Sequence, residues 1–250
     1  FPDERESCLQ FARAHPGYRW VHKPADGSWG HGVAVYRDVE AIPDTPAMLV
    51  QCYLDDPLTH EGRKFNLRVY LLITCLTPMV AWVYRDGYVD LAMTPYVARG
   101  DGFDDPRVFN TNTHVQTRLT GLDAPSCSLS LRRWLGGLGT DADTGWRLWD
   151  AIRTLLGRLA RAIGYALLPE LSPYLVNPRN CFELLGLDLQ IGRDLRPWLI
   201  ECNRSPELAA LSSKAVKKRL IADLVELVQP GCAREPATGF ERLDTRTLRE

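Results

Sequence analysis

Residues 182–206 read FELLGLDLQI, GRDLR and PWLIECNRSP, and they give the clearest structural signal in the chain. Two apolar runs surround a short segment of turn-forming residues, which is the pattern of two strands joined in a hairpin. The first run ends at Ile191 and the second begins at Pro197. The sequence therefore predicts a β-hairpin in this part of the chain.

Polar side chains interrupt both strands of this predicted hairpin. Successive side chains of a strand point to opposite faces, so Asp188 lies opposite its apolar neighbours, and Glu201 and Asn203 share one face. An unpaired buried charge is costly, although a solvated strand face is the commoner explanation for a carboxylate taken alone. Two carboxylates and one amide carbonyl are hard oxygen donors that suit Mg²⁺. The hairpin is thus a candidate magnesium site.

The rest of the chain mixes helix and strand patterns. The expected elements are a helix over 3–15, strands over 18–23 and 33–36 on either side of a glycine-rich loop, strands over 48–54, 65–75, 81–84 and 88–93, a core helix over 145–163 that ends near Gly164, and an amphipathic helix over 212–228. Asp86-Gly87 lies between two of these strands and predicts a second hairpin. Helices mixed with hairpins indicate an α+β fold and not a doubly wound parallel sheet.

The composition is typical of a globular protein with a sizeable core, since 45% of the 250 residues are hydrophobic and 24% are charged. The formal net charge of -1 gives no global attraction to nucleic acid or membranes, so neither is expected as a partner. No apolar run reaches the roughly 20 residues of a membrane span. No secretion signal opens the chain, which starts without Met as a mature fragment or excised domain would. The 7 cysteines include no close pair, which predicts neither a disulfide framework nor a zinc site and fits a reducing cytoplasm.

The hairpin also carries a family resemblance. GLDLQI followed by WLIECNRSPEL resembles the metal-binding end of the tubulin tyrosine ligase-like (TTL/TTLL) family of the ATP-grasp superfamily, whose pattern reads FD(V/I), a turn and WLLEVN-x-SPS. Other segments resemble family motifs in the family's order: WVHKP at 20–24 with the loop after it, VQCYL at 50–54 with DPL at 56–58, GRKFNLRVY at 62–70, YRDG at 84–87, and Thr111-Asn112 with Gln116. The resemblance extends from residue 20 to residue 208.

This resemblance implies an ATP-grasp fold, with mostly antiparallel sheets, flanking helices and a nucleotide bound between two lobes. The implied domains are an N-terminal helix and glycine-loop lobe at 1–48, a C-terminal lobe with the metal-binding hairpin at 49–230, and a tail at 231–250.

Three segments have physical reasons to bind a nucleotide. Lys23 precedes a loop whose glycines let backbone N–H groups approach phosphates, although a surface lysine beside a turn is the plainer explanation. Residues 51–54 form either an adenine-binding hinge or a buried strand. Lys64, Asn66 and Arg68 alternate with apolar residues, so all three project to one side of a strand, as they also would on a solvent-facing strand.

The resemblance assigns roles to individual residues. It implies ATP binding by Lys23, Gln51, Cys52, Tyr53, Leu54, Lys64, Asn66, Thr111 and Asn112, substrate binding by Arg68 and by Arg85 at the predicted hairpin tip, metal binding by Asp188, Glu201 and Asn203, and catalysis by Lys23, Arg68 and Glu201. The implied cofactors are ATP and one or two Mg²⁺ ions.

Two positions depart from the family pattern. Asn66 stands where the family has Asp, so that contact loses its charge. Glutamate-using members bind the amino acid with a lysine near the position of residues 126–128, and this chain has no lysine there. Glutamate is therefore not implied by the resemblance.

The implied activity is that of an ATP-dependent carboxylate–amine ligase, which adds an amino acid to a protein or peptide carboxylate through an acyl-phosphate. The alternatives are an ATP-grasp ligase acting on small molecules or free peptides, and a non-catalytic nucleotide-binding module. A monomer is expected, with tubulin as one candidate acceptor. A basic cluster on the final predicted helix could face an acidic polypeptide, although a solvated helix face is commoner; it consists of Lys214, Lys217, Lys218 and Arg219.

Overall fold

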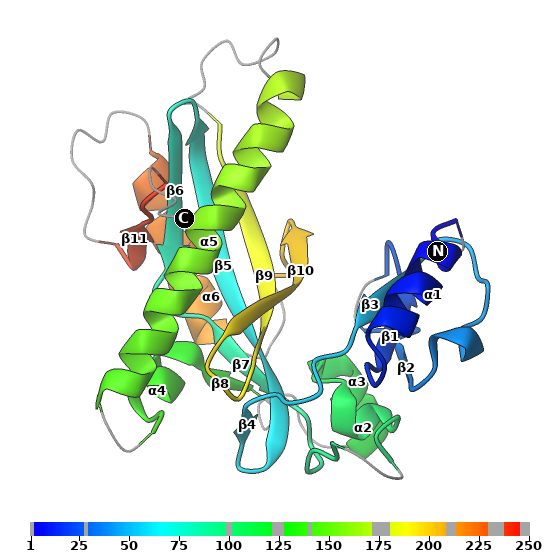
Figure 1. Ribbon diagram of the computed structural model, residues 1–250. Coiled ribbons are helices and arrows are strands. Elements are labelled where there is room, and N and C mark those ends of the chain that lie inside the picture. The colour runs from blue at the N-terminus through cyan, green and yellow to red at the C-terminus, as the bar shows by residue number, and fades with distance from the viewer. Residues whose placement is uncertain are drawn as a thin grey trace. The chain divides into compact units, whose positions relative to one another are not determined.

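The computed structural model describes residues 3–27, 30–98, 102–121, 128–139, 142–171, 181–208, 214–229 and 238–245. The chain forms two compact units, whose elements are labelled in Figure 1. The first unit comprises residues 1–66, 90–127 and 191–194, and the second comprises residues 67–89, 128–190 and 195–250.

A three-stranded antiparallel sheet forms the centre of the first unit, in the order β2-β1-β3. Its strands are β1 (Trp20–Pro24), β2 (Ala34–Tyr36) and β3 (Met48–Cys52). Helix α1 (Arg5–Ala14) packs beside the short 3-10 helix η1 (Val39–Ala41), around a core of Trp20, Val39 and Ile42. These elements confirm the predicted helix over 3–15 and the three predicted strands.

Two short helices complete the first unit, α2 (Pro106–Phe109) and α3 (Thr113–Thr120). Each begins at a side chain that accepts a hydrogen bond from the first turn, Asp105 for α2 and Asn112 for α3. The fully buried Gln116 joins the surrounding segments, because its amide donates to carbonyls of Pro106 and Asn110 and accepts from the backbone of Met93. The segment from residue 105 to residue 121 is therefore fixed by capping and by one buried amide.

A larger sheet contains most of the strands of the second unit, in the order β10-β9-β5-β6-β11. The strands are β5 (Arg63–Leu76), β6 (Met79–Tyr84), β9 (Glu183–Ile191), β10 (Pro197–Arg204) and β11 (Phe240–Arg242), with β4 (Thr59–His60), β7 (Tyr88–Leu91) and β8 (Ser128–Ser130) paired beside this path. The β5 pairings with β6 and β9 are antiparallel. This arrangement confirms the α+β fold and the hairpin predicted from residues 182–206.

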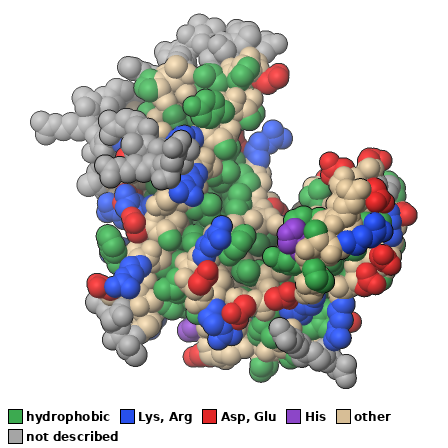
Figure 2. All heavy atoms as spheres, viewed as in Figure 1, with side chains coloured by type: hydrophobic (Ala, Val, Ile, Leu, Met, Phe, Trp, Pro, Cys, Tyr) green, Lys and Arg blue, Asp and Glu red, His purple; other side chains and the backbone are tan. Residues whose placement is uncertain are grey.

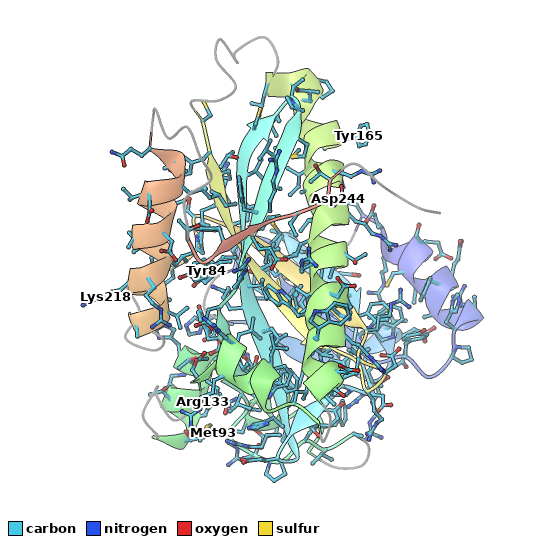
Figure 3. All side chains as sticks on the ribbon, turned by 90° about the vertical axis from the view of Figure 1, so that its left-hand side faces the viewer. Tyr84, Met93, Arg133, Tyr165, Lys218 and Asp244 are labelled. Atoms are coloured by element: carbon cyan, nitrogen blue, oxygen red, sulfur yellow. The ribbon has the colours of Figure 1, made fainter. Side chains whose placement is uncertain are left out.

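Two helices cover opposite faces of this sheet, as Figures 1 and 3 together show. They are α5 (Ala142–Leu171) and α6 (Lys214–Val228). On the α6 side, alternate residues of β5 and β6 form one core cluster with the apolar residues of α6, comprising Tyr70, Leu72, Trp82, Tyr84, Val216, Leu220 and Leu224. The short helix α4 (Leu131–Gly136) packs against α5. In the view of Figure 2, acidic and basic side chains are interspersed over the surface, in keeping with the balanced composition.

The core helix is longer than predicted, because α5 continues past Gly164 to Leu171. The glycine was interpreted as a helix end, but it lies inside the helix against Met79, where an added Cβ would be 2.5 Å from the methionine Cε. Gly164 therefore permits close packing of the helix on the sheet and does not end it.

The prediction of a hairpin around Asp86-Gly87 was wrong. Strand β6 pairs with β5 and β11, and β7 pairs with β5 and β8, so β6 and β7 are not partners. An added Cβ at Gly87 would overlap the backbone carbonyl of Arg68, so the glycine lets the chain pass close to β5. The Asp86 side chain is buried and accepts hydrogen bonds from Gly87 N and Ser130 Oγ. Both residues thus serve tertiary contacts, and Arg85 lies in a connection between two strands and not at a hairpin tip.

Candidate functional site

Lys64 is the most unusual of the predicted nucleotide-binding residues. It belongs to the part of β5 in the first unit, and only 5% of it is exposed. Its Nζ donates a 3.0 Å hydrogen bond to the carbonyl of Phe109 and lies 4.5 Å from the centre of the Tyr53 ring. Burial, with a smaller effect of the Arg19 charge, lowers the pKa of Lys64 to about 7. A cation with one carbonyl partner in a buried site is well suited to meet an anion.

Tyr53 is buried and holds the backbone of the predicted hinge in place. Its backbone N–H donates a 2.8 Å hydrogen bond to the carbonyl of Arg19, whose guanidinium lies 4.6 Å from the centre of the tyrosine ring. Arg19 is buried and forms an ion pair with Asp55. The Tyr53 ring therefore packs against two cationic side chains of the protein, Arg19 and Lys64. The neighbouring hinge residues offer more surface to a ligand, since Cys52 is exposed and Gln51 is half-buried.

The glycine loop lies against the segment between α2 and α3. Gly30 and Gly32 have φ angles of +70° and +72°, which favour glycine. Asn110 Nδ2 donates to the carbonyl of Gly30 at 3.2 Å, and a Cβ added at Gly30 would be 3.0 Å from the Asn112 Cβ. The fold thus brings the predicted loop and the predicted Asn112 together.

Three more predicted nucleotide contacts lie in the same unit. Lys23 is half-buried on β1, opposite Leu49 of β3. Thr111 is buried, and Leu54 is half-buried immediately after Tyr53.

Asn66 carries a buried acceptor that the described residues leave unsatisfied. Its Oδ1 has no hydrogen-bond partner among them. A buried oxygen without a donor costs about 1–3 kcal/mol. The side chain is therefore suited to accept a hydrogen bond from a ligand at the position where the family pattern has a carboxylate.

Arg68 and Asp188 form a half-buried ion pair in the second unit. They are direct cross-strand partners on β5 and β9, and the guanidinium donates to both carboxylate oxygens, at 2.5 Å from Nε and 3.1 Å from Nη2. Arg68 Nη1 also lies 3.3 Å from the Tyr88 hydroxyl. Although burial alone would lower it, the pKa of Arg68 is raised by the Asp188 charge and this hydrogen bonding. A carboxylate has about four acceptor positions, so two remain on Asp188 for a cation.

Glu201 and Asn203 lie on β10, the strand next to β9. Alternation places them on one face, where Glu201 is exposed and Asn203 is half-buried. Burial raises the pKa of the Cys202 thiol, and the charges of Glu183 and Glu201 raise it further. Among the described residues no group of three His, Cys, Asp or Glu side chains could hold a metal ion, so a cation here would need the asparagine and ligands from outside the protein.

Arg85 pairs with β11 and the residue just before it. Its exposed side chain forms a 3.5 Å ion pair with Glu241 of β11, and its backbone N–H donates to the carbonyl of Gly239. Strand β11 is only three residues long, so no sequence pattern predicts this pairing.

Sequence reasoning also missed several residues that build the site. Arg19 and Asn110 hold the hinge and the glycine loop, and Tyr88 supports Arg68. Asn110 belongs to the turn-forming run Asn-Thr-Asn-Thr, which was the available signal. The signal for the other two is weak, because arginine and tyrosine at strand ends are common.

The fold and the two sets of residues define an α+β protein with a buried lysine, a glycine loop and a hairpin that carries oxygen ligands. The model of the tubulin-tyrosine ligase family matches residues 1–236, and the chain belongs to this family. Among the described residues, no helix is long and apolar enough to cross a membrane.

Curated relatives cover most of the chain at modest identity. A probable tubulin polyglutamylase TTLL9 of Bos taurus is 28% identical over 91% of this chain and 57% of its own length. A tubulin polyglutamylase TTLL6 of Mus musculus is 29% identical over 96% of this chain and 30% of its own length. A tubulin monoglutamylase TTLL4 of Mus musculus is 27% identical over 84% and 18%. The chain thus spans little more than half, or less, of the curated relatives it matches.

Proposed function

We propose that this chain is an ATP-dependent carboxylate–amine ligase that adds an amino acid to a carboxylate of a protein or peptide. The observation that carries the proposal is the family match over residues 1–236, which includes every residue assigned to the candidate site. Relatives named tubulin polyglutamylase and tubulin monoglutamylase make glutamate the first amino acid to test and a tubulin tail the first acceptor. We further propose a cytoplasmic monomer, in keeping with a tubulin acceptor.

The residues of the first unit fit a nucleoside triphosphate. The Lys64 ammonium would pair with phosphate oxygens, and the backbone around Gly30 would donate hydrogen bonds to them. The unsatisfied Asn66 Oδ1 would accept a hydrogen bond from a hydroxyl of the ligand. Gln51 and Cys52 would contact the adenine, while Tyr53 holds the hinge in place. The acceptor carboxylate would attack the γ-phosphate of ATP, which forms an acyl-phosphate and releases ADP. The amine would then attack the acyl carbon, which forms the amide bond and releases phosphate.

The residues of the second unit fit Mg²⁺. Asp188, Glu201 and Asn203 would hold the ion through oxygen atoms, which are the ligands it prefers. When bound, Mg²⁺ would supply positive charge that stabilises the negative charge of phosphoryl transfer. Arg68 holds the Asp188 carboxylate in one orientation through its two hydrogen bonds, and the raised pKa of Arg68 keeps its guanidinium positively charged at neutral pH.

Arg85 is proposed to bind a substrate carboxylate through its guanidinium. Its present ion pair with Glu241 is long, at 3.5 Å, and the arginine side chain is exposed to solvent. Arg85 would exchange this ion pair for a bidentate pairing with the substrate carboxylate. Of residues 126–128, where glutamate-using family members have a lysine and this chain has none, residues 126 and 127 lie outside the described residues.

The test is ADP release from Mg·ATP by the purified chain, measured with each of the 20 amino acids, with and without tubulin. Release that requires both glutamate and tubulin supports the proposal, and mass spectrometry of the tubulin should then find added glutamate. Release with another amino acid would change the substrate but retain the reaction. Release with small molecules alone would replace the proposal with a small-molecule ligase.

A second candidate is a nucleotide-binding module without turnover, which Asn66 in place of the family aspartate favours. Asn66→Asp distinguishes the two. If the wild type binds ATP without releasing ADP and Asn66→Asp restores release, the natural chain is a binding module. Equal release by both proteins excludes this candidate.

A further inference from the structure

A concave pocket lies entirely within the second unit, and the proposed reaction uses only one of its residues. Its volume is about 680 Å³, which falls within the range of about 300–1,000 Å³ typical of ligand sites. It is lined by Tyr84, Arg85, Asp86, Ser130, Arg132, Arg133, Arg219, Asp223 and Gly239. Four of the lining residues are arginines and two are aspartates. The pocket is therefore cationic on a chain whose net charge is only -1.

Both aspartates of the pocket are occupied by donors from the protein itself. Asp86 is buried and accepts hydrogen bonds from Ser130 Oγ at 3.1 Å and from the backbone N–H of Arg132 at 3.1 Å. Asp223 accepts from the Tyr84 hydroxyl at 2.9 Å and from Gly239 N at 3.0 Å. Neutral donors thus occupy one oxygen of each carboxylate, Oδ1 of Asp86 and Oδ2 of Asp223.

The arginines keep more of their binding capacity. Arg219 Nη2 reaches Asp86 at 3.2 Å, but the arginine side chain is 60% exposed. Arg132 and Arg133 are exposed on α4, and their guanidinium groups have no ion pair or hydrogen bond within the part of the chain that the structure describes. Figure 3 shows Arg133 on α4, on the side of the sheet that α6 covers. Each guanidinium offers a planar fork of donors that matches a carboxylate.

Neighbouring residues of α6 have quite different positions. Lys217 is 2% exposed, with its ammonium 5.5 Å from the centre of the Tyr88 ring. Lys218 projects from the outer side of α6, away from the sheet (Figure 3), and does not line the pocket. Arg219 turns toward Asp86. Among the cluster members whose side chains the structure describes, Lys217 is buried and Arg219 lines the pocket, so the basic cluster predicted from the sequence is not one solvated face.

We propose that this pocket binds an acidic polypeptide segment, with the side-chain carboxylates of consecutive Glu or Asp residues paired to Arg132, Arg133 and Arg219. The volume exceeds what one carboxylate or one phosphate needs, and separate guanidiniums on α4 and α6 suit several carboxylates carried by one chain. This assignment rests on the proposed function in one respect, that the ligase takes a polypeptide acceptor. It adds the place at which the acceptor's charge is recognised.

The test is binding of a fluorescein-labelled peptide of ten glutamates, followed by anisotropy in low salt without ATP. Arg132→Gln/Arg133→Gln should weaken binding about five- to tenfold, because two exposed charge pairs are lost. The matched control Arg147→Gln/Lys218→Gln also removes two exposed positive charges, but outside the pocket, and should change the dissociation constant less than twofold. Equal weakening by both pairs would overturn the proposal in favour of nonspecific attraction.

Charge reversal guards against a variant that merely misfolds. Arg132→Glu/Arg133→Glu should lose the glutamate peptide and gain binding of a ten-lysine peptide, which a misfolded chain would not do selectively. Inorganic phosphate provides the remaining comparison. If millimolar phosphate displaces the peptide as completely as unlabelled peptide at the same charge concentration, the pocket is a small-anion site and the polypeptide assignment fails.

Failure of the proposed reaction remains distinguishable from failure of the pocket assignment. A chain that binds the glutamate peptide through Arg132 and Arg133 but releases no ADP would retain the pocket and lose the ligase. A chain that releases ADP with tubulin equally well after Arg132→Gln/Arg133→Gln, with unchanged KM for tubulin and unchanged peptide binding, would retain the ligase and lose the pocket.

Discussion

Lys64→Met should remove a defined part of the pH dependence of stability. In the folded chain the pKa of Lys64 is lowered from 10.5 to about 7, first by burial and then by the charge of Arg19. The unfolded chain therefore binds more protons than the folded chain between pH 7 and pH 10.5, and the free energy of unfolding rises with pH in this window. Below pH 7 both states hold the proton and this contribution to the slope disappears.

The size of the effect follows from the shift. One pKa unit corresponds to about 1.36 kcal/mol, and integration from pH 7 to pH 9 with these two pKa values gives a gain of about 2 kcal/mol for the wild type. Methionine retains the length of the side chain and its contact with the Tyr53 ring, but it has no proton to lose. The variant should therefore lack this gain.

The assay is urea unfolding at pH 7, 8 and 9 of the wild type, Lys64→Met and Lys218→Met. Titration of cysteines and histidines is common to all three proteins, so it cancels when a variant is compared with the wild type. Lys218→Met removes an exposed lysine and should keep the wild-type dependence. If Lys64→Met keeps it as well, the ammonium is not buried as described, and its use as a phosphate contact loses its physical basis.

Further substitutions test the other parts of the site and the sheet. Asp188→Asn leaves the half-buried Arg68 without its counter-ion and should lower the free energy of unfolding by about 1–3 kcal/mol in urea titrations. Glu201→Gln should abolish amino-acid-dependent ADP release with an unchanged urea midpoint, because Glu201 is exposed; undiminished release would remove it from the metal site. Gly87→Ala should cost at least about 2–3 kcal/mol, since its Cβ would meet backbone, whereas Gly164→Ala should change thermal stability by less than about 1 kcal/mol, since its Cβ meets only a flexible methionine end. A smaller loss for Gly87 than for Gly164 would contradict the packing described at both positions.

The elements with strong periodicity could be predicted from the sequence. The predicted strand over 65–75 and the observed Arg63–Leu76 agree because apolar alternation sets both the strand and its buried face. Pairing is different, because it depends on distant partners. Asp-Gly predicts a hairpin from local preference, yet a buried Asp86 bonded to Ser130 and a close approach to Arg68 determine the chain path at this point.

The candidate site shows the same division. Alternation placed Glu201 and Asn203 on one face of a strand, and the structure agrees on the strand. No local pattern marks Lys217 as buried or Lys64 as a partner of the Phe109 carbonyl, because each contact joins segments far apart in the sequence. The sequence therefore does not predict which charged side chains of a helix or strand are buried, because that depends on how distant segments pack together.

The pairing of Arg68 with Asp188 joins two roles that the resemblance treated separately. The sequence alone suggests one residue for phosphate and one for metal, and the register of β5 against β9 makes them direct neighbours. While both carboxylate oxygens accept hydrogen bonds from Arg68, the carboxylate cannot rotate freely, so its remaining acceptor positions point in fixed directions. A cation that binds there finds the carboxylate already oriented. The positive charge of Arg68 on the same carboxylate, however, repels the cation. Loss of Arg68 should thus affect metal affinity in both directions, through less repulsion and through a looser ligand. Arg68→Lys keeps the charge and loses the fork, so weaker Mg²⁺ binding by this variant than by the wild type would show that the orientation of Asp188 matters. Arg68→Met loses both the charge and the fork, so tighter Mg²⁺ binding by Arg68→Met than by Arg68→Lys would show that repulsion by Arg68 matters, and equal binding by all three proteins would contradict both effects.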